Sequence, residues 1–396
     1  MNATHRNIAI TVNILYTTIM RIARYLDISQ EIRPGKTLIL FGPRRVGKTT
    51  LLMDFIKETT KKIIDYRGDE ISTQHAFDTP DSALLRDAVG TADVLVIDEA
   101  QAIKNIGQSL KIINDTLPHV AVVVTGSSSF ELAGQVGEPL TGRKMTKYLL
   151  PISLRELLTE DIAPARTLQQ KLQSWLVYGM YPDVITAKTN EERRDFLREI
   201  VDSYLLKDIL IYQDVKGSRV LLQLLILLSH QIGSEVSLTE LGSSLGIDKN
   251  TVARYLDLLE KAYIIFRLGG FSRNLRSEVT KTAKYYFYDV GIRNAVINNF
   301  NELSLRDDIG KLWENFVIVE RLKTRLYTNL YANQYFWRTW QQNEIDLVEE
   351  REGKLFGFEI KWKTKLTVMP REWQEAYGKE ATWKMITPDN ILAFIK

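Results

Sequence analysis

The sequence predicts a multidomain α/β protein that begins with a parallel sheet, continues through a helical segment and ends in a second α/β segment. The chain has 396 residues, which is too long for one ordinary hydrophobic core. Between residues 36 and 126, short apolar runs alternate with helical stretches, a pattern typical of parallel strands covered on both faces. After residue 151 amphipathic helical stretches dominate, and strand-like runs return from residue 263.

Composition and charge narrow the class of protein. Apolar residues make up 45% and charged residues 26% of the chain, as in soluble globular proteins. The lack of cysteine excludes disulfides and thiolate sites and fits a reducing cytosol, and the four histidines are too scattered for a zinc site. The longest apolar run, 220–228, is shorter than the roughly 20 residues that span a bilayer. Asn and Thr interrupt the apolar stretch at 7–20, which we interpret as a strand or helix and not a signal. We therefore expect a cytoplasmic protein without a membrane segment.

The first predicted domain covers residues 1–150 and is built on the parallel sheet. Its strand candidates read TLILF, KKIIDY, DVLVID and VAVVVTG, and the stretches between them have helical periodicity. The expected strands are residues 37–41, 61–66, 93–98 and 120–126, and the expected helices are 48–60, 81–90 and 103–116.

A glycine-rich turn joins the first strand to the first helix. Residues 41–50 read FGPRRVGKTT, and Gly42, Gly47, Lys48 and Thr49 have the spacing of a phosphate-binding loop. The glycines let backbone N–H groups turn toward an anion, and the helix N-terminus adds partial positive charge. Lys48 would contact the β- and γ-phosphates, and Thr49 would ligand Mg²⁺. We therefore predict an ATP and Mg²⁺ site whose residues are Gly42, Pro43, Arg44, Arg45, Val46, Gly47, Lys48, Thr49 and Thr50.

Two adjacent acids end the third strand candidate. Asp98 and Glu99 follow the apolar run in DVLVIDEA. An acid at the carboxyl end of a parallel strand faces the ligand crevice. We expect Asp98 to hold the Mg²⁺ shell and Glu99 to polarise an attacking water.

One strand candidate lies between the glycine-rich loop and the acidic strand, and the next strand ends in TGSSS. Here the chain resembles the AAA+ group of P-loop ATPases, whose acidic strand is one strand removed from the P-loop strand. The resemblance implies a polar γ-phosphate sensor on the following strand, which either Thr125 or Ser127 could supply. The stretch LTGRKMTKYLLPISLREL resembles a "GR…L.P.S..E" segment of prokaryotic members. It implies that Arg143 is an arginine finger or sensor, in cis or in trans.

The middle of the chain divides into two predicted domains. Residues 151–216 are expected to be helical, and residues 217–298 contain a helix-turn-helix pattern with a turn at Gly246 and Asp248 as N-cap. The second segment resembles a winged helix with YIIFRLGGF and KYYFYDV as wing strands. From Asp248 to Lys284 there are eight basic and four acidic residues, which favours DNA over a protein partner. The residues expected to contact DNA are Lys249, Asn250, Thr251 and Arg254.

The last predicted domain, residues 299–396, contains a helix and then the strand candidates QYFWRT, EIDLVEE and KLFGFEIKWK. Alternation places Glu359 and Lys361 on one face of their strand. An acidic strand followed by Glu-x-Lys resembles the PD-(D/E)xK fold of restriction enzymes and junction resolvases. The resemblance implies that Asp346, Glu359 and Glu314 ligand a metal ion and that Lys361 positions water. Any half-exposed strand can also place Glu beside Lys.

The order of ATPase domain, winged helix and nuclease-like tail resembles, across nearly the whole chain, a group of prokaryotic AAA-type ATPases. The resemblance implies a Mg²⁺-dependent ATPase that couples nucleotide state to DNA engagement. Two alternatives stay open: an ATP-regulated DNA nuclease, and a slow nucleotide-gated switch that recruits a protein through the winged helix and an inactive tail. DNA is the expected partner, and a protein partner and a homo-oligomer also stay open.

Overall fold

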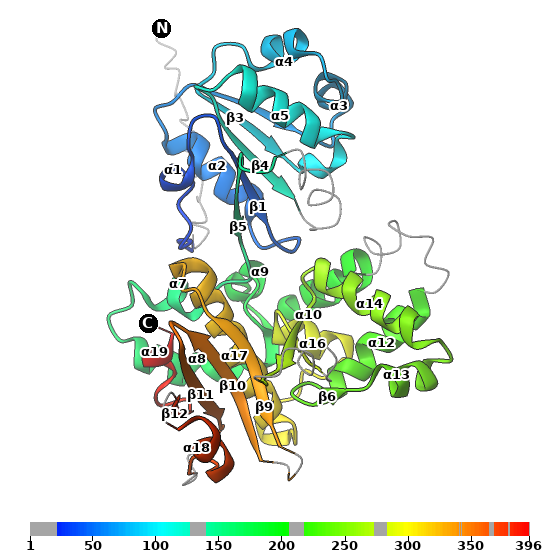
Figure 1. Ribbon diagram of the computed structural model, residues 1–396, viewed down its shortest axis with the longest axis vertical. Coiled ribbons are helices and arrows are strands. Elements are labelled where there is room, and N and C mark those ends of the chain that lie inside the picture. Colours follow the sequence, from blue (N-terminus) through cyan, green and yellow to red (C-terminus); the bar gives the residue numbers. More distant parts are fainter. Residues whose placement is uncertain are drawn as a thin grey trace, which may run out of the picture.

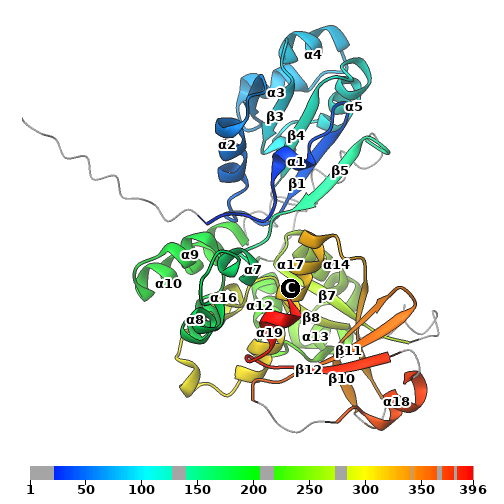
Figure 2. The same ribbon diagram turned by 90° about the vertical axis from the view of Figure 1, so that its left-hand side faces the viewer.

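The computed structural model describes residues 22–126, 140–205, 218–272, 283–339, 341, 343–363, 368–378 and 381–395. These residues form two bodies along the long axis (Figure 1). The first body contains a five-stranded sheet, and the second contains a seven-stranded sheet with most of the helices. Figure 2 shows the chain passing from one body to the other after β5.

The sheet of the first body is parallel throughout, in the order β2-β3-β4-β1-β5. Every residue of β1, β3 and β4 is buried, because helices cover both faces. The two edge strands, β2 and β5, differ, because their residues are exposed or half-buried. The strands are β1 (Thr37–Phe41), β2 (Ile63–Arg67), β3 (Val94–Asp98), β4 (Ala121–Gly126) and β5 (Lys144–Tyr148).

Alternate strand residues enter two separate cores. Leu38 and Val96 pack with α1 and α2 on one face, whereas Ile39 and Ile97 pack with α3, α4 and α5 on the other. The expected strands and helices of this part are confirmed to within a few residues, and β5, α1 and α3 were not predicted. The helices are α1 (Ile28–Glu31), α2 (Lys48–Glu58), α3 (Ile71–Phe77), α4 (Ser82–Val89), α5 (Ile106–Thr116) and the short 3-10 helix η1 (Ala100–Ala102).

The second body begins with helices, as predicted. Capping boxes at Ser153 and Thr189 begin two of them, since each hydroxyl and the Glu three residues later satisfy backbone N–H groups. The helices are α7 (Leu154–Leu158), α8 (Pro164–Tyr178), α9 (Pro182–Thr186), α10 (Asn190–Glu199) and the π-helix η2 (Ile200–Leu205).

Four helices and three strands follow among the described residues. Asp248 caps α14 by accepting from the N–H groups of Asn250 and Thr251 at 2.9 and 3.1 Å, and Gly246 ends α13, so the predicted turn between two helices is confirmed. The elements are α12 (Ser218–His230), β6 (Glu235–Val236), α13 (Leu238–Leu245), α14 (Lys249–Lys261), β7 (Ile265–Gly270), β8 (Ala283–Phe287) and α16 (Val290–Val296).

The C-terminal elements extend the same sheet. The order is β12-β11-β10-β9-β7-β8-β6, and β7 pairs with β9 in parallel, with Gly269 opposite Tyr335. One hydrophobic core contains residues from Leu26 to Ile395. The segments before and after residue 298 are therefore parts of one sheet and one core. The elements are η3 (Leu303–Leu305), α17 (Ile309–Thr328), β9 (Asn333–Arg338), β10 (Glu344–Arg351), β11 (Lys354–Ile360), α18 (Arg371–Tyr377), β12 (Ala381–Ile386) and α19 (Ile391–Phe394).

Candidate functional site

The loop between β1 and α2 folds closely around the Lys48 side chain. A Cβ added to Gly42 would lie 1.9 Å from the carbonyl oxygen of Leu149. Gly47, the N-cap of α2, has a φ of 93°, a conformation that favours glycine. The Lys48 ammonium donates to the carbonyls of Gly42 and Pro43, both at 2.9 Å. The lysine is therefore held within the loop, at the N-terminus of α2.

Asp98 lies beside the start of α2. Its Oδ2 accepts from the hydroxyl of Thr49 at 2.7 Å, and its Oδ1 accepts from the hydroxyl of Thr125. Thr125 is on β4, which separates β1 from β3. The predicted strand arrangement is thus confirmed. Of the two sensor candidates, Thr125 contacts Asp98, whereas Ser127 lies outside the described residues.

Glu99 has a different environment from its neighbour. It is half-buried and has a φ of 53°, which is uncommon for a residue other than glycine. Its N–H donates to Thr125 Oγ1 at 3.0 Å, and its carboxylate accepts from the Gln101 side chain. Two adjacent carboxylates therefore have the separate surroundings that two separate roles require.

The other loop residues lie at different depths. Pro43 and Val46 are buried, Arg44 and Thr50 are exposed, and Arg45 is half-buried. The Arg45 guanidinium pairs with Glu199 on α10 at 2.5 Å and lies 5.3 Å from the centre of the Phe196 ring. The loop thus contacts the second body directly.

Sequence reasoning missed Arg24, which lies before α1 against the same loop. Its guanidinium donates to the carbonyls of Val46 at 2.5 Å and Leu150 at 2.6 Å, and to Glu156 Oε1 at 2.9 Å. Burial would raise the pKa of Glu156, but Arg24 and the N–H groups of Tyr25 and Ser153 hold it below its ordinary value. A buried glutamate requires a cation nearby, yet nothing in the sequence connects position 156 with position 24.

The structure does not bring Arg143 to the loop. β5 runs parallel to β1, with Lys144 opposite Thr37, so Arg143 precedes the amino end of the strand whereas the loop follows the carboxyl ends. The separation along the sheet is roughly 16 Å. The guanidinium of Arg143 donates to Asp115 at 2.6 Å. This position does not favour a contact of Arg143 with phosphate in its own chain, and its role as an arginine finger or sensor, in cis or in trans, stays a prediction.

The predicted C-terminal site residues come together beside α17. Lys361 Nζ lies 2.6 Å from Glu359 Oε1 and 3.6 Å from Asp346 Oδ2, so one ammonium group joins both carboxylates. Glu314 on α17 accepts from the Tyr286 hydroxyl at 2.6 Å. We call this group, with the two residues named next, the carboxylate cluster.

Two further charged residues of the carboxylate cluster, Lys284 and Glu344, were not predicted. Lys284 on β8 is 1% exposed, pairs with Glu344 and lies 3.6 Å from Glu314 Oε1. Lys284 lies in the run that was expected to be a wing strand, far along the chain from the Glu-x-Lys pattern. The contact depends on how β8 packs in the sheet, and sequence spacing does not predict it.

The charges of the carboxylate cluster bear on metal binding. Burial and the neighbouring Asp346 raise the pKa of Glu314 to about 7, and burial also raises the pKa values of Asp346 and Glu359. Among the residues that the structure describes, no three His, Asp or Glu side chains are arranged to hold a metal ion.

The predicted DNA-contacting residues lie in the first turns of α14. Lys249, Asn250 and Arg254 are exposed and Thr251 is half-buried. The Thr251 hydroxyl donates to Asp248 at 2.5 Å, so Thr251 also helps to cap the helix. The exposed side chains are available to a partner.

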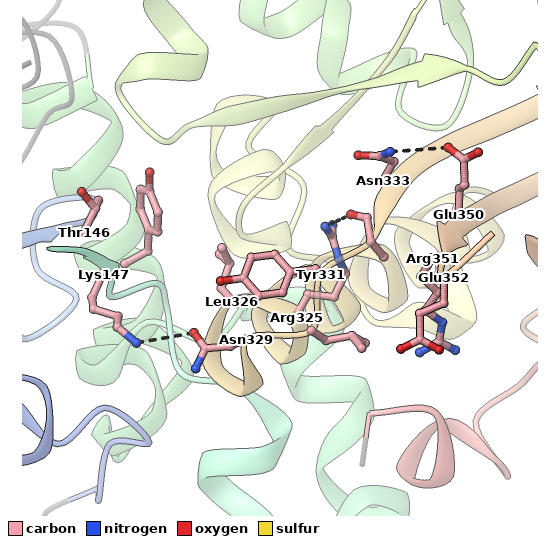
Figure 3. Close-up of a pocket in the computed structure, with 13 residues that line it drawn as sticks. Thr146, Lys147, Arg325, Leu326, Asn329, Tyr331, Asn333, Glu350, Arg351 and Glu352 are labelled. Atoms are coloured by element: carbon pink, nitrogen blue, oxygen red, sulfur yellow. Dashed lines mark hydrogen bonds between the residues drawn. The ribbon is translucent and has the colours of Figure 1, made fainter. Parts of the chain in front are cut away.

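A hollow of about 550 Å³ lies at the seam between the bodies (Figure 3). It is lined by residues near the ends of β5, α17 and β10, and Lys147 donates to Asn329 across it at 3.5 Å. It contains none of the predicted site residues.

In the described parts of the chain, no helix has the length and apolar character to cross a membrane.

The strand order, the glycine-rich loop after β1 and the acid that ends β3 define the class of P-loop nucleotide-binding domains found in AAA-type ATPases. Residues 34–158 match a family described as "AAA domain". Residues 169–303 and 309–381 match two more families, each described as a domain of unknown function.

Several relatives are similar over most of their length. An uncharacterized protein of Mycobacterium tuberculosis is 28% identical over 363 residues, which cover 91% of this chain and 78% of the relative. An uncharacterized protein of Methanocaldococcus jannaschii is 24% identical over 347 residues, which cover 83% of this chain and 75% of the relative. One of Haemophilus influenzae is 25% identical over 305 residues, with 72% and 74% covered. These names assign no activity.

Two solved structures align weakly. The signal transduction ATPase with numerous domains from Pyrococcus horikoshii has a TM-score of 0.26 and 10% identity, covering 73% of this chain and 43% of that one. Drosophila ORC bound to AT-rich DNA and Cdc6 has a TM-score of 0.24 and 12% identity, covering 67% and 85%. Similarity this low supports no statement about this chain.

Proposed function

We propose that this protein binds ATP with Mg²⁺ at the loop between β1 and α2, hydrolyses it, and couples the nucleotide state to DNA engagement through α14. The observation that carries the proposal is the hydrogen-bonded set of Thr49, Asp98 and Thr125 beside Lys48. This set joins the start of α2 to the carboxyl ends of two parallel strands, where open α/β sheets bind ligands. The AAA-domain match of residues 34–158 supports the same function.

Each residue of the site has a distinct task in this proposal. Bound Mg²⁺ would neutralise charge on the β- and γ-phosphates. Thr49 and Asp98 would hold it, because hard cations prefer oxygen ligands. Lys48 would exchange its two carbonyl partners for phosphate oxygens. Glu99 would orient the attacking water. Thr125, which donates to Asp98 and accepts from the Glu99 N–H, would fix the positions of the two acids relative to each other.

The DNA part of the proposal is supported by α14 and the elements around it. The order helix, strand, two helices and two strands, with β8 pairing antiparallel with both β6 and β7, fits the winged-helix interpretation. Lys249 and Arg254 are exposed on α14, where a recognition helix contacts DNA. A protein ligand for this surface is the alternative.

Measuring ATP hydrolysis with and without duplex DNA tests the proposal. We expect Mg²⁺-dependent turnover that DNA increases. Slow turnover that DNA leaves unchanged would instead support a nucleotide-gated switch with a protein partner. A folded protein that neither binds nor hydrolyses ATP would contradict the assignment of the loop.

The carboxylate cluster favours a second candidate function, cleavage of DNA. Asp346 and Glu359 share Lys361, so the three residues of the nuclease-like pattern lie within one small site. The carboxylates of Asp346 and Glu359 would have to be drawn toward a metal ion, since no preformed metal site is present among the described residues; the ion would supply activation of water for attack on a phosphodiester. Incubating DNA with the protein and Mn²⁺, beside an Asp346→Asn variant, tests this function. Cleavage that survives the substitution would contradict it.

A further inference from the structure

We propose that Arg24 is a positioning residue for phosphate binding: its guanidinium fixes the peptide between Val46 and Gly47 so that the Gly47 N–H faces the phosphate groups. This inference rests on the proposed nucleotide site and adds a residue from outside the loop. Arg24 precedes the first strand, and Val46 lies 22 positions after Arg24 in the chain.

The geometry of one peptide unit carries the first step. Arg24 Nη1 lies 2.5 Å from the Val46 carbonyl oxygen. No peptide bond in the described residues is cis, so the N–H of Gly47 points away from that carbonyl. A donor that fixes the carbonyl on one side of the loop therefore fixes the N–H on the other. Backbone N–H groups of such loops are the groups that cradle phosphates.

Charge adds to this orientation. A hydrogen bond from a guanidinium is charge-assisted, and a hydrogen bond to one end of a peptide polarises the other end. The side chains of Arg24 and Glu156 are only 8% and 1% exposed, so solvent screens this interaction weakly. Arg24 therefore makes the Gly47 N–H a better donor as well as an oriented one.

The same guanidinium also holds residues 149–156, which we call the strap. Arg24 donates to the Leu150 carbonyl at 2.6 Å and to Glu156 at 2.9 Å. Three contacts attach the strap to α17 of the second body. Leu150 N–H donates to the Tyr327 hydroxyl at 3.2 Å, Lys323 Nζ to the Ile152 carbonyl at 2.9 Å, and Leu154 N–H to Glu320 at 2.7 Å. One side chain thus links the phosphate-binding loop to the strap on which α17 is docked.

A purely structural role for Arg24 would be to neutralise the buried Glu156. The two roles predict different results for Glu156→Gln, which removes the charge of the carboxylate and leaves the Arg24 contact with Val46. If Arg24 positions the loop, this variant keeps its nucleotide affinity. If Arg24 only balances charge, Glu156→Gln relieves the need for it, and Arg24→Met combined with Glu156→Gln restores binding.

The experiment measures the dissociation constants of ATP and ADP, the KM and kcat for ATP, and the melting temperature. Arg24→Met should weaken both nucleotides about tenfold or more, the range for losing a hydrogen bond from a charged group. KM should rise more than kcat falls. The reason is that the weakened contact is the one from the Gly47 N–H to phosphate groups that ATP and ADP share. Arg24→Lys should recover only part of the affinity, since one ammonium cannot satisfy all three acceptors with the geometry of a guanidinium.

Arg155→Met is the matched control, because it removes a neighbouring cation that lies 4.8 Å from the centre of the Tyr25 ring. This variant should bind both nucleotides like the unmodified protein. The variant that combines Arg24→Met and Glu156→Gln leaves neither Arg24 nor Glu156 as an unpaired charge. A loss of nucleotide affinity in this combined variant therefore supports loop positioning, even if Arg24→Met alone unfolds. Unchanged affinity in folded Arg24→Met, or restored affinity in the combined variant, would overturn the inference. An unmodified protein that binds neither nucleotide would overturn the proposed function as well.

Discussion

Asp98 and Glu99 are adjacent in the chain, yet their side chains are held by different groups. Asp98 ends a buried strand and accepts hydrogen bonds from two hydroxyl groups. Glu99 begins the next turn in a left-handed conformation. The change of backbone conformation between them separates a carboxylate held by two hydroxyl groups from one that accepts from the Gln101 side chain.

Glu99→Gln should keep ATP affinity within about threefold and lower kcat by on the order of 100-fold. The substitution removes the charge that orients water but leaves Asp98 and Thr49 in place. Nucleotide binding and single-turnover hydrolysis measure the two effects separately. Asp98→Asn is the comparison, and it should weaken Mg²⁺-dependent binding. An equal loss of affinity and turnover in Glu99→Gln would show that Glu99 is structural.

Lys48→Ala should lower ATP affinity roughly 10- to 100-fold while the protein stays folded. Lys48 is buried, but its ammonium donates to carbonyls of its own loop, so its loss affects the loop more than the core. Equilibrium binding and a thermal melt measure both consequences. Lys57→Ala is the control, because Lys57 is an exposed lysine of the same helix. Normal turnover in folded Lys48→Ala would refute the site.

Glu260 on α14 should make stability depend on pH. Burial raises its pKa from 4.5 to about 7, although Arg267 opposes the shift. The folded protein therefore holds this proton more tightly than the unfolded chain. The stability that the proton contributes is complete below about pH 4.5 and is lost as the pH rises through 7. Urea unfolding at pH 5 and pH 8 gives the difference in unfolding free energy between the two pH values. This difference should be smaller for Glu260→Gln than for the unmodified protein. Equal differences in both proteins would contradict the assignment.

The first turns of α14 form an exposed basic surface whose backbone is fixed by the Asp248 cap. Replacing Lys249 and Arg254 by Ala should weaken DNA binding and reduce the slope of log affinity against log salt by about two. The reason is that each phosphate contact contributes about 0.9 to that slope. Lys261→Ala is the control, because Lys261 lies at the far end of the same helix and pairs with Asp257 at 2.7 Å. An unchanged slope would assign α14 to a protein partner.

The two parts of the seven-stranded sheet have to be tested together. β9 pairs with β7, so a fragment that begins near residue 299 would lose the strand on which β9 is built. The shared core leads to the same conclusion. Experiments on the carboxylate cluster therefore require the full chain.

Mn²⁺ should raise the melting temperature of the nucleotide-free protein through the carboxylate cluster. Without metal, close carboxylates repel one another, and a ligand that binds only the folded state stabilises it. Asp346→Asn should lose the shift, and Lys361→Ala should keep it but remove any DNA cleavage. Asp98→Asn should keep the shift, which excludes the other carboxylate site as its source. If the unmodified protein shows no shift, the nuclease interpretation fails.

The nucleotide loop, the paired acids, the buried strands and the cap of α14 could all be predicted from the sequence. Each depends on residues close together in the chain, such as Gly42 with Gly47, or Asp248 with Thr251. Helix and strand periodicity and turn chemistry act over this short range. β5 was missed because KMTKY is an edge strand with no continuous apolar run.

Packing alone decided the remaining features. Arg24 contacts Glu156 across 132 positions, and Lys284 contacts Glu344 across 60. Arg143 was expected at the phosphate site, but the parallel direction of β5 places it at the opposite end of the sheet. Which distant side chains meet depends on how the strands and helices pack, because no local propensity relates residues so far apart. The sequence therefore determined the chemistry of the loop, and the tertiary structure decided which residues surround it.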